Sequence, residues 1–215
     1  MTDSRGFVRA HTRLSPVPLV PEILLYQADE AIALWEETET EAATRQPPPF
    51  WAFAWAGGQA LARYVLDNPA LVGGRRVLDL AAGSGLVAVA AAKAGATTVT
   101  AVDIDPLSLA AVAANASANA VTVAAVERDI LDSAPDADVV LAGDVFYSRE
   151  MAQRMMAYFQ RAADGGATVL VGDPGRAYLP RSEALREVAA YEVPVVATLE
   201  DANVKHTTVW AIEAV

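Results

Sequence analysis

The sequence predicts an open α/β fold, a doubly wound sheet of mostly parallel strands with helices on both faces. From residue 75 onward, short apolar segments alternate with segments of helical character. A glycine-rich loop directly follows the first apolar segment, which is where such sheets bind a nucleotide. The 215 residues are enough for one substantial domain of this class. Strands that alternate with helices form parallel sheets covered on both faces.

The N-terminal part is predicted to be an arm followed by a helix. Residues 1–20 lack hydrophobic periodicity, which predicts a loose arm. Residues 22–44 contain seven acidic side chains with apolar residues between them, which predicts an acidic, partly amphipathic helix. The acidic side chains form either a solvated face or a rim that faces a substrate. Three prolines at 47–49 end this helix, and residues 50–55 hold four aromatic side chains.

The remaining elements follow from apolar runs and helix signals. Runs of aliphatic residues are typical of strands buried on both faces, and small-residue segments that start after a glycine or at a proline are typical of helices. The predicted strands are residues 76–80, 98–102, 121–126, 137–142 and 167–171, and the predicted helices are residues 85–95, 106–119, 149–163 and 181–190. Residues 193–199 and 207–212 are predicted to close the sheet as an antiparallel pair.

The composition excludes several classes of function. The formal net charge is -11, whereas a nucleic-acid binder needs a basic surface, so we expect no nucleic-acid partner. The absence of cysteine excludes disulfides and thiolate chemistry. A histidine-based metal site would have to use His11 or His206, so we expect no metal. No apolar run reaches about 18 residues, and the first fifteen residues lack an apolar segment, so we expect a cytoplasmic protein without a membrane partner.

The loop after the first strand has the features of a nucleotide site. Asp79 lies in the strand, Gly83 and Gly85 follow it, and a helix comes next. Glycines let the backbone approach a ligand, and a helix N-terminus offers unpaired N–H groups. Asp103 ends the next strand, where a carboxylate can accept both hydroxyls of a ribose.

Two cofactors fit this loop. Residues 83–88 match the pattern G-x-G-x-x-A, which indicates NAD. S-adenosylmethionine instead carries a positive amino group and a sulfonium, which prefer a carboxylate such as Asp79 nearby, whereas a pyrophosphate has no need of that acid. We therefore favour S-adenosylmethionine over NAD. A tight turn that binds nothing is the third interpretation.

Two further strand ends carry candidate site residues. Asp129 follows the third strand, where it can accept from an adenine amino group while Ile130 packs on the ring; otherwise Asp129 is a capping acid. The fourth strand ends with Asp144, Phe146 and Tyr147. Ligands of open α/β sheets bind at such strand ends, although Asp144 can instead be a buried structural acid.

These residues resemble the seven-β-strand, class I methyltransferases. Three stretches carry the resemblance, at residues 77–85, 103–106 and 144–147, and the Asp-x-Phe-Tyr form of the last is similar to the lysine-methylating branch. Over residues 21–212 the chain resembles the family of the electron transfer flavoprotein β-subunit lysine methyltransferase and its bacterial relatives. The specific stretches are Trp-x-Gly-Gly-Gln at 55–59 and Gly-Asp-Pro-Gly-Arg at 172–176.

The resemblance implies a fold, a cofactor and site residues. The implied sheet is Rossmann-like with the strand order 3-2-1-4-5-7-6 and strand 7 antiparallel. Residues 1–56 would form a helical extension that packs on the core, and residues 57–215 the methyltransferase domain. The implied contacts of S-adenosylmethionine, which leaves as S-adenosylhomocysteine, are Trp55, Asp79, Gly83, Gly85, Asp103, Asp129 and Ile130. The chain departs from the family pattern at Ala56, where proline is usual, and at Ala81, where glycine is usual.

The implied reaction is methyl transfer to a lysine of a protein, with the electron transfer flavoprotein β-subunit as the expected substrate. The amine attacks only when neutral, and a desolvated pocket with aromatic walls lowers its pKa from about 10.4. Asp144 and Tyr147 are the expected catalytic residues: Asp144 orients the amine, and Trp55 and Tyr147 form the walls. Phe146 is expected to contact the substrate.

The loop after the fifth strand carries the last candidate site residues, and three other functions compete with lysine methylation. Asp173 and Arg176 lie in a tight turn or contact the protein substrate. A methyltransferase acting on a small nicotinamide-like amine or on a ribosomal protein would use the same cofactor. An NAD-dependent oxidoreductase would need an acid or base, for which only two lysines are present. A binding protein without activity is disfavoured because Asp79, Gly85 and Asp144 are intact.

Overall fold

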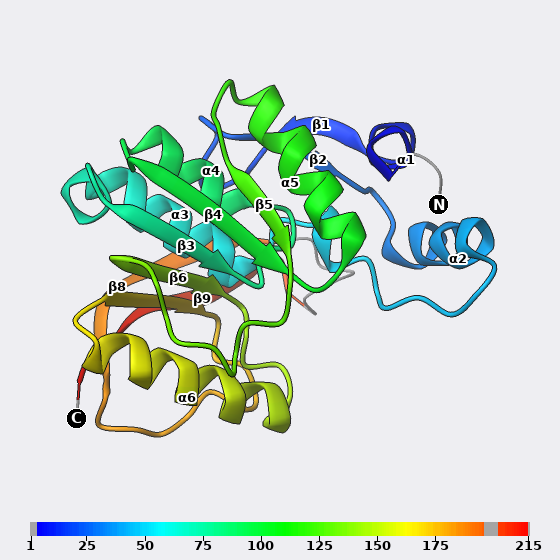
Figure 1. The fold of residues 1–215 in the computed structure, drawn as a ribbon. Helices are drawn as coiled ribbons and strands as arrows, with labels where there is room; N and C mark the ends of the chain where they lie inside the picture. The colour runs from blue at the N-terminus through cyan, green and yellow to red at the C-terminus, as the bar shows by residue number, and fades with distance from the viewer. Residues whose placement is uncertain (1–3, 196–201, 215) are drawn as a thin grey trace.

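A computed structural model describes residues 4–195 and 202–214, and within them seven strands form the central sheet. The strands stand in the order β5-β4-β3-β6-β7-β9-β8 (Figure 1). Their bounds are β3 (Arg76–Leu80), β4 (Thr98–Asp103), β5 (Ala124–Glu127), β6 (Val139–Gly143), β7 (Thr168–Asp173), β8 (Leu185–Pro194) and β9 (Val204–Ile212). β9 is antiparallel to both neighbours, and the other pairs are parallel. Counted from β3, the implied order 3-2-1-4-5-7-6 is confirmed.

Helices cover both faces of this sheet. They are α3 (Ala56–Asp67), α4 (Leu86–Lys93), α5 (Pro106–Ala118) and α6 (Arg149–Asp164). Alternate residues of a strand point to opposite faces. In β3, Val77 packs into a cluster with α3 and α4, whereas Leu78 packs into a cluster with α6. Val112 of α5 belongs to the first cluster, so α6 lies across the sheet from the other three helices (Figure 1).

The N-terminal segment differs from the prediction. Instead of a loose arm, it contains α1 (Ser4–His11) and the hairpin of β1 (Arg13–Pro16) and β2 (Leu24–Gln27). The predicted helix over 22–44 is confirmed only for α2 (Ala31–Ala42). Tertiary contacts decide the structure here: Phe7 and Val8 are buried in a cluster with residues of α5. α1 has one apolar side, but its eight residues give only about two turns of pattern, and helices this short gain their stability from packing.

Residues 181–190 form no helix, so this prediction is wrong. β8 occupies most of the segment and pairs with β9, with a bulge between Glu187 and Ala189. The segment is rich in Ala, Glu, Leu and Arg, which are good helix formers, but helix propensity contributes little energy per residue and strand pairing with β9 outweighs it. The closing antiparallel pair is confirmed as β8 with β9. Residues 196–199 of the predicted strand lie outside the described residues.

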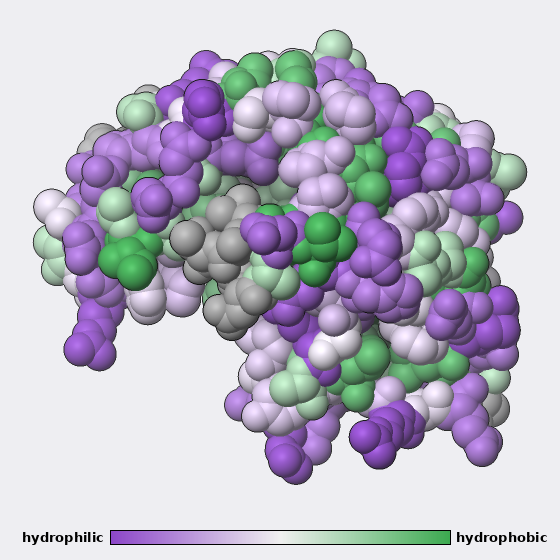
Figure 2. All heavy atoms as spheres, turned by 180° about the vertical axis from the view of Figure 1, so that it is seen from behind, coloured by the Kyte–Doolittle hydropathy of each residue, from purple (hydrophilic) through white to green (hydrophobic). Residues whose placement is uncertain are grey.

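The surface carries scattered apolar side chains. The face in Figure 2 is hydrophilic over most of its area, with small separate apolar areas. The exposed large apolar residues are Leu14, Ile32, Trp35, Phe50, Ile104, Tyr147, Tyr178 and Val204. No helix within residues 4–195 and 202–214 combines the length and apolar character that a membrane crossing requires.

Candidate active site

The carboxyl ends of β3, β4, β6 and β7 meet at one edge of the sheet, because these strands are parallel neighbours. The N-terminus of α3 reaches the same edge, where the N–H of Gly58 donates to Asp144 after β6. Open α/β sheets bind their ligands at this edge. The loops that leave it carry the predicted site residues.

The loop between β3 and α4 has a backbone shape that favours glycine. Gly83 has a φ of 51° and Gly85 a φ of 75°. A Cβ at Gly85 would lie 2.9 Å from Cγ2 of Val112, so glycine is also needed for packing against α5. The N–H of Gly83 donates to Oδ2 of Asp103 at 2.8 Å, and Oδ1 of Asp103 accepts from the N–H of Asp105 at 3.0 Å. Asp103 is therefore held against the glycine loop.

Asp79 lies beneath this loop with 1% of its surface exposed. Its Oδ2 accepts from the N–H of Ala88, in the first turn of α4, at 2.9 Å. Burial raises the pKa of Asp79 well above its usual range, and the negative charge of Asp103 adds to the effect. A cation bound over the loop would favour the ionised form, whereas a pyrophosphate would oppose it. The pair of acids therefore favours a cationic ligand.

Ala81 carries backbone strain in the same loop. Its φ is 55°, a region that costs an L-residue about 1–2 kcal/mol. We expect Ala81→Gly to raise the free energy of unfolding, measured with urea, by about 1 kcal/mol. Ala82→Gly is the matched control, because Ala82 has no positive φ and glycine there is expected to destabilise by about 0.5–1 kcal/mol. Equal effects of the two substitutions would contradict this explanation.

Asp144 connects three elements at the centre of the edge. It follows β6 with a φ of 59°, a conformation that Asp tolerates better than most residues. Its N–H donates to the carbonyl oxygen of Gly172 at 2.9 Å. Oδ2 accepts from the N–H of Gly58 at 3.0 Å and thereby caps α3, and Oδ1 accepts from Nη2 of Arg176 at 2.6 Å. The side chain is 10% exposed. Asp144 is therefore both a helix cap and an ion-pair partner.

Arg176 reaches Asp144 from the loop after β7. Oδ1 of the buried Asp173 accepts from the N–H groups of Gly175 and Arg176, both at 2.7 Å. The guanidinium carbon of Arg176 lies 5.6 Å from the centre of the Trp55 ring, within the range of a cation–π contact. The predicted tight turn is therefore present, and it directs Arg176 at the centre of the site.

Three aromatic rings lie at the same edge. The Phe50 ring is 5.8 Å from that of Tyr147 and 5.9 Å from that of Trp55, and Nε1 of Trp55 donates to the carbonyl oxygen of Phe50 at 2.8 Å. Partial burial raises the pKa of Tyr147, so its hydroxyl is neutral at physiological pH. Phe146 is 0% exposed and packs in the core beside α6, so its ring does not reach the surface of the site.

Asp129 and Ile130 lie on a loop next to Asp103, with partners of their own. The N–H of Arg128 donates to the carbonyl oxygen of Asp103 at 3.0 Å, which places the start of the loop there. Asp129 is exposed, forms an ion pair with Arg154 at 2.9 Å and accepts from a backbone N–H two residues later. The Arg154 guanidinium lowers the pKa of Asp129. Ile130 packs against the core cluster under α6.

The residues that hold the loops together were missed by sequence reasoning. Asn115 of α5 is 0% exposed; its Nδ2 donates to the carbonyl oxygen of Ser84 in the glycine loop, and its Oδ1 accepts from the N–H of Tyr26, both at 2.8 Å. An amide among alanines was the available signal, because buried polar groups need partners. Gly58 contributes only its backbone N–H, which donates to Asp144, and the residue type does not indicate such a role.

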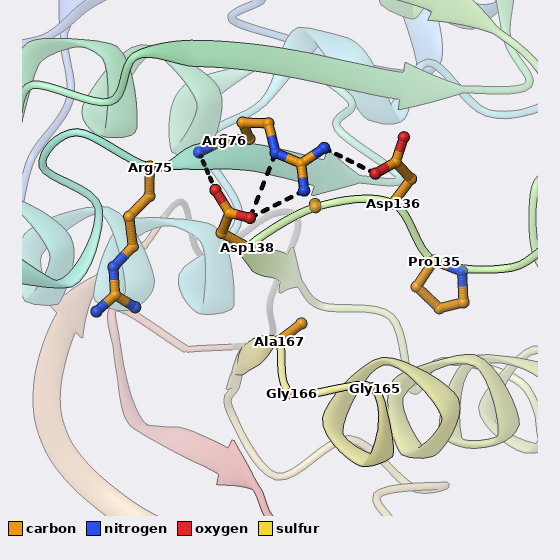
Figure 3. A pocket seen from close by; sticks show the side chains of 9 residues that line it. Arg75, Arg76, Pro135, Asp136, Asp138, Gly165, Gly166 and Ala167 are labelled. Atoms are coloured by element: carbon orange, nitrogen blue, oxygen red, sulfur yellow. Dashed lines mark hydrogen bonds and ion pairs between the residues drawn. The ribbon is translucent and has the colours of Figure 1, made fainter.

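A depression of about 370 Å³ lies at the opposite edge of the sheet (Figure 3). Its lining includes Arg76 at the start of β3 and Ala167 just before β7, which are the amino ends of these strands. Arg76 forms ion pairs with Asp136 at 2.7 Å and Asp138 at 2.9 Å, so these charges are already matched (Figure 3). We therefore assign the candidate active site to the carboxyl edge.

Comparisons with known proteins show the class and the family of this chain. The family described as "Ribosomal protein L11 methyltransferase (PrmA)" matches residues 60–167. The electron transfer flavoprotein β-subunit lysine methyltransferase of Xenopus laevis is 36% identical to this chain over an alignment of 226 positions. The alignment covers 99% of this chain and 88% of the relative. The Homo sapiens protein of the same name is 34% identical, and the alignment covers 97% of this chain and 82% of the human protein. Magnesium protoporphyrin IX methyltransferase from Synechocystis PCC 6803 with bound S-adenosylmethionine shares the fold, with a TM-score of 0.54, 14% identity and coverage of 73% and 79%.

The sheet order, the glycine loop and these similarities define a class I, S-adenosylmethionine-dependent methyltransferase. The interpretation as an NAD-dependent oxidoreductase is therefore set aside. Within this class, the chain belongs to the electron transfer flavoprotein β-subunit lysine methyltransferase family.

The residues present fit S-adenosylmethionine. At Gly83, a Cβ would meet only backbone atoms of residues 50 and 51 at 3.9–4.0 Å, so the loop is open there. Asp103 stands at the end of β4 beside this opening, and the buried Asp79 lies beneath, where a bound cation would favour its ionised form. An open loop above two carboxylates suits a ligand that combines a ribose with a cationic amino acid.

Proposed function

We propose that this protein methylates a lysine side chain of the electron transfer flavoprotein β-subunit. Identity of 34–36% over almost the whole chain to relatives of that name carries the proposal. The geometry supports it, because Asp144 follows β6 at the edge of the sheet where the rings of Phe50, Trp55 and Tyr147 also lie, and its partner Arg176 contacts the ring of Trp55. Such a site suits a long amine with an apolar stem.

The cofactor contacts are proposed residue by residue. Asp79, Gly83 and Gly85 would hold the methionine end, Asp79 through its charge from beneath the loop. Asp103 would accept from the ribose hydroxyls, and Asp129 and Ile130 would face the adenine. Trp55 would form a wall of the site. When bound, S-adenosylmethionine would supply an electrophilic methyl carbon, so that a C–N bond to the amine forms as the C–S bond breaks, S-adenosylhomocysteine leaves, and the methylated ammonium ion releases a proton to water.

The chain's own residues would desolvate and align the lysine. The rings of Trp55 and Tyr147 would exclude water once the lysine stem lies against them, which would lower the pKa of the amine and favour the nucleophilic form. Asp144 accepts from the amine and holds the lone pair toward the methyl group; alignment of this kind supplies a large part of such a rate enhancement. Direct displacement by a neutral amine needs no Lewis acid, so we propose a reaction without a metal.

The proposal extends to the N-terminal segment, the location and further substrate contacts. We propose that residues 1–56 are an extension of a methyltransferase domain of residues 57–215; the burial of Phe7 and Val8 against α5 supports the packing of this extension on the core. We also propose a cytoplasmic location without nucleic-acid or membrane partners, because the net charge is -11 and the sequence has no apolar run of about 18 residues. Substrate contacts of Asp173 and Arg176 are supported by their loop at the site. The complete burial of Phe146 leaves Tyr147 as the favoured aromatic contact.

The test is the intact mass of recombinant flavoprotein β-subunit after incubation with this protein and S-adenosylmethionine. Gains in methyl-sized steps, located on lysine by peptide fragmentation, are expected. Ribosomal protein L11 serves as the second acceptor, because the family model over residues 60–167 favours it as the alternative. Methylation of L11 alone, or of a nicotinamide-like amine alone, would overturn the proposed substrate and leave the methyltransferase class intact.

Cofactor binding is expected to strengthen as the pH rises through the raised pKa of Asp79. In the free protein, burial keeps Asp79 protonated above its usual range. The positive cofactor favours the ionised form, so binding releases a proton and gains affinity with pH. Calorimetric titrations between about pH 5 and 8, in buffers of different ionisation enthalpy, would measure both effects. Asp79→Asn is the control and should lose this pH dependence; its persistence would assign the proton to another group.

A further inference from the structure

The pair formed by Asp144 and Arg176 is built into the fold. Arg176 is fixed at its backbone by Asp173, and its guanidinium lies over the Trp55 ring, whose Nε1 is itself hydrogen-bonded. Asp144 is fixed by its own N–H and by the N–H of Gly58. The side chain of Arg176 is 22% exposed and that of Asp144 is 10% exposed. Such a pair persists without substrate, because both partners are held by groups outside the pair.

This pair determines the charge that a lysine meets. The contacts of the Arg176 guanidinium include the carboxylate of Asp144 and the ring of Trp55, while Asp173 binds the backbone N–H of Arg176 and Gly58 binds the other oxygen of Asp144. Without the guanidinium, the carboxylate of Asp144 would meet the amine with its full negative charge. An opposite charge within about 4–6 Å favours the charged form of an amine by about 1–3 pKa units. An ammonium ion held in this way has no lone pair and cannot attack.

We propose that Arg176 is a positioning residue that neutralises Asp144, so that the site admits the lysine as an uncharged amine instead of holding it as an ammonium ion. The proposal rests on the proposed function, because it concerns the same site and a lysine substrate. The lysine leaves its proton in water before it enters. Asp144 then acts as a hydrogen-bond acceptor for the neutral amine and not as a counter-ion.

The first test uses n-butylamine, which has the amine and stem of a lysine side chain and requires no flavoprotein. Binding is measured by NMR between about pH 7 and 10, below and near the pKa of about 10.4 of such amines. The wild-type protein is expected to bind n-butylamine more tightly as the pH rises, because the site accepts the uncharged amine. Arg176→Gln is expected to bind at least about tenfold more tightly than wild type at pH 7 and to gain nothing at higher pH.

Two variants control this test. Arg176→Lys keeps the positive charge and should behave as wild type. The double variant Asp144→Asn with Arg176→Gln should lose the tight binding at pH 7. Equal binding by wild type and Arg176→Gln at pH 7 would overturn the proposal, whether or not the flavoprotein is the substrate.

The second test is the pH dependence of methyl transfer. Arg176→Gln should lower both KM and kcat at neutral pH, and the acidic limb of kcat should move up by at least about one pH unit, since a trapped ammonium must first lose its proton. Arg186→Gln, which removes an exposed ion pair with Glu213, is the matched control and should leave the limb in place. A loss of kcat that no pH restores would overturn the proposal in favour of a purely structural arginine. Failure of wild type to methylate the flavoprotein would refute the proposed substrate, and the binding of n-butylamine would then decide the role of Arg176 by itself.

Discussion

Gly57→Ala is expected to lower the free energy of unfolding by about 4 kcal/mol or to prevent folding. A Cβ at this position would lie 2.2 Å from the carbonyl oxygen of Gly172 and 2.6 Å from Oδ2 of Asp144. The first atom belongs to the backbone of β7, and the second caps α3. Rotation of a side chain cannot relieve the overlap, so α3 would have to withdraw from the sheet.

Gly58→Ala is the matched control for this variant. A Cβ there would meet only Cδ2 of Leu86 at 3.8 Å, and alanine favours a helix over glycine by up to about 1 kcal/mol. We therefore expect unchanged or slightly higher stability. Urea denaturation followed by circular dichroism measures both variants. A Gly57→Ala protein as stable as wild type would show that α3 does not approach β7 this closely.

The close approach explains both specific stretches of the sequence. A Cβ at Gly172 would lie 2.0 Å from the carbonyl oxygen of Gly57, and one at Gly143 would lie 2.8 Å from Gly58. Gly57 and Gly172, one from each stretch, therefore let two backbones touch. This contact brings the N-terminus of α3 to Asp144, so a packing requirement also positions the site.

The central sheet was predictable because its strands are buried on both faces. Runs such as residues 76–80 and 137–142 have few polar residues, and the helices between them have clear starts, as at Pro106. β8 was mistaken for a helix because it lies at the edge of the sheet, where exposed charged residues interrupt the strand pattern. The hairpin of β1 and β2 is held by Asn115 of α5 and by Asn119 directly after this helix, which accept from backbone N–H groups of β2 about 90 residues away, and no local pattern reveals such contacts.

The candidate site was predictable in its residue types and not in its connections. Acids at the ends of β3, β4 and β6 follow from the rule that ligands bind at such ends. The ion pair between Asp144 and Arg176 joins two loops that are 32 residues apart, and the N–H of Gly58 joins Asp144 across 86 residues. Only the packed sheet brings these groups together, so the double role of Asp144 could not be read from its neighbours in sequence.

Asp144→Asn is expected to lower kcat for lysine methylation by about 100-fold or more and to leave S-adenosylmethionine affinity nearly unchanged. Asparagine is nearly isosteric and tolerates the positive φ of 59° at this position. Its Oδ1 can still accept from the N–H of Gly58, so α3 stays capped. The substitution removes the negative charge that meets Arg176 and the acceptor that faces the amine. Single-turnover transfer and calorimetric cofactor titration measure the two quantities separately.

Asp144→Ala separates the catalytic role from the structural one. Alanine at this position loses the cap of α3, strains the backbone and leaves the guanidinium of Arg176 without this partner, which together are expected to cost about 3 kcal/mol or more of stability. Asp144→Asn keeps the cap of α3 and tolerates the backbone, so it should lose clearly less stability than Asp144→Ala, with the loss confined to its contact with Arg176. A near wild-type transfer rate in Asp144→Asn would reduce Asp144 to a helix cap. Loss of cofactor binding together with transfer would show that the carboxylate also maintains the glycine loop, against the separation of roles argued from its contacts with Gly58 and Arg176.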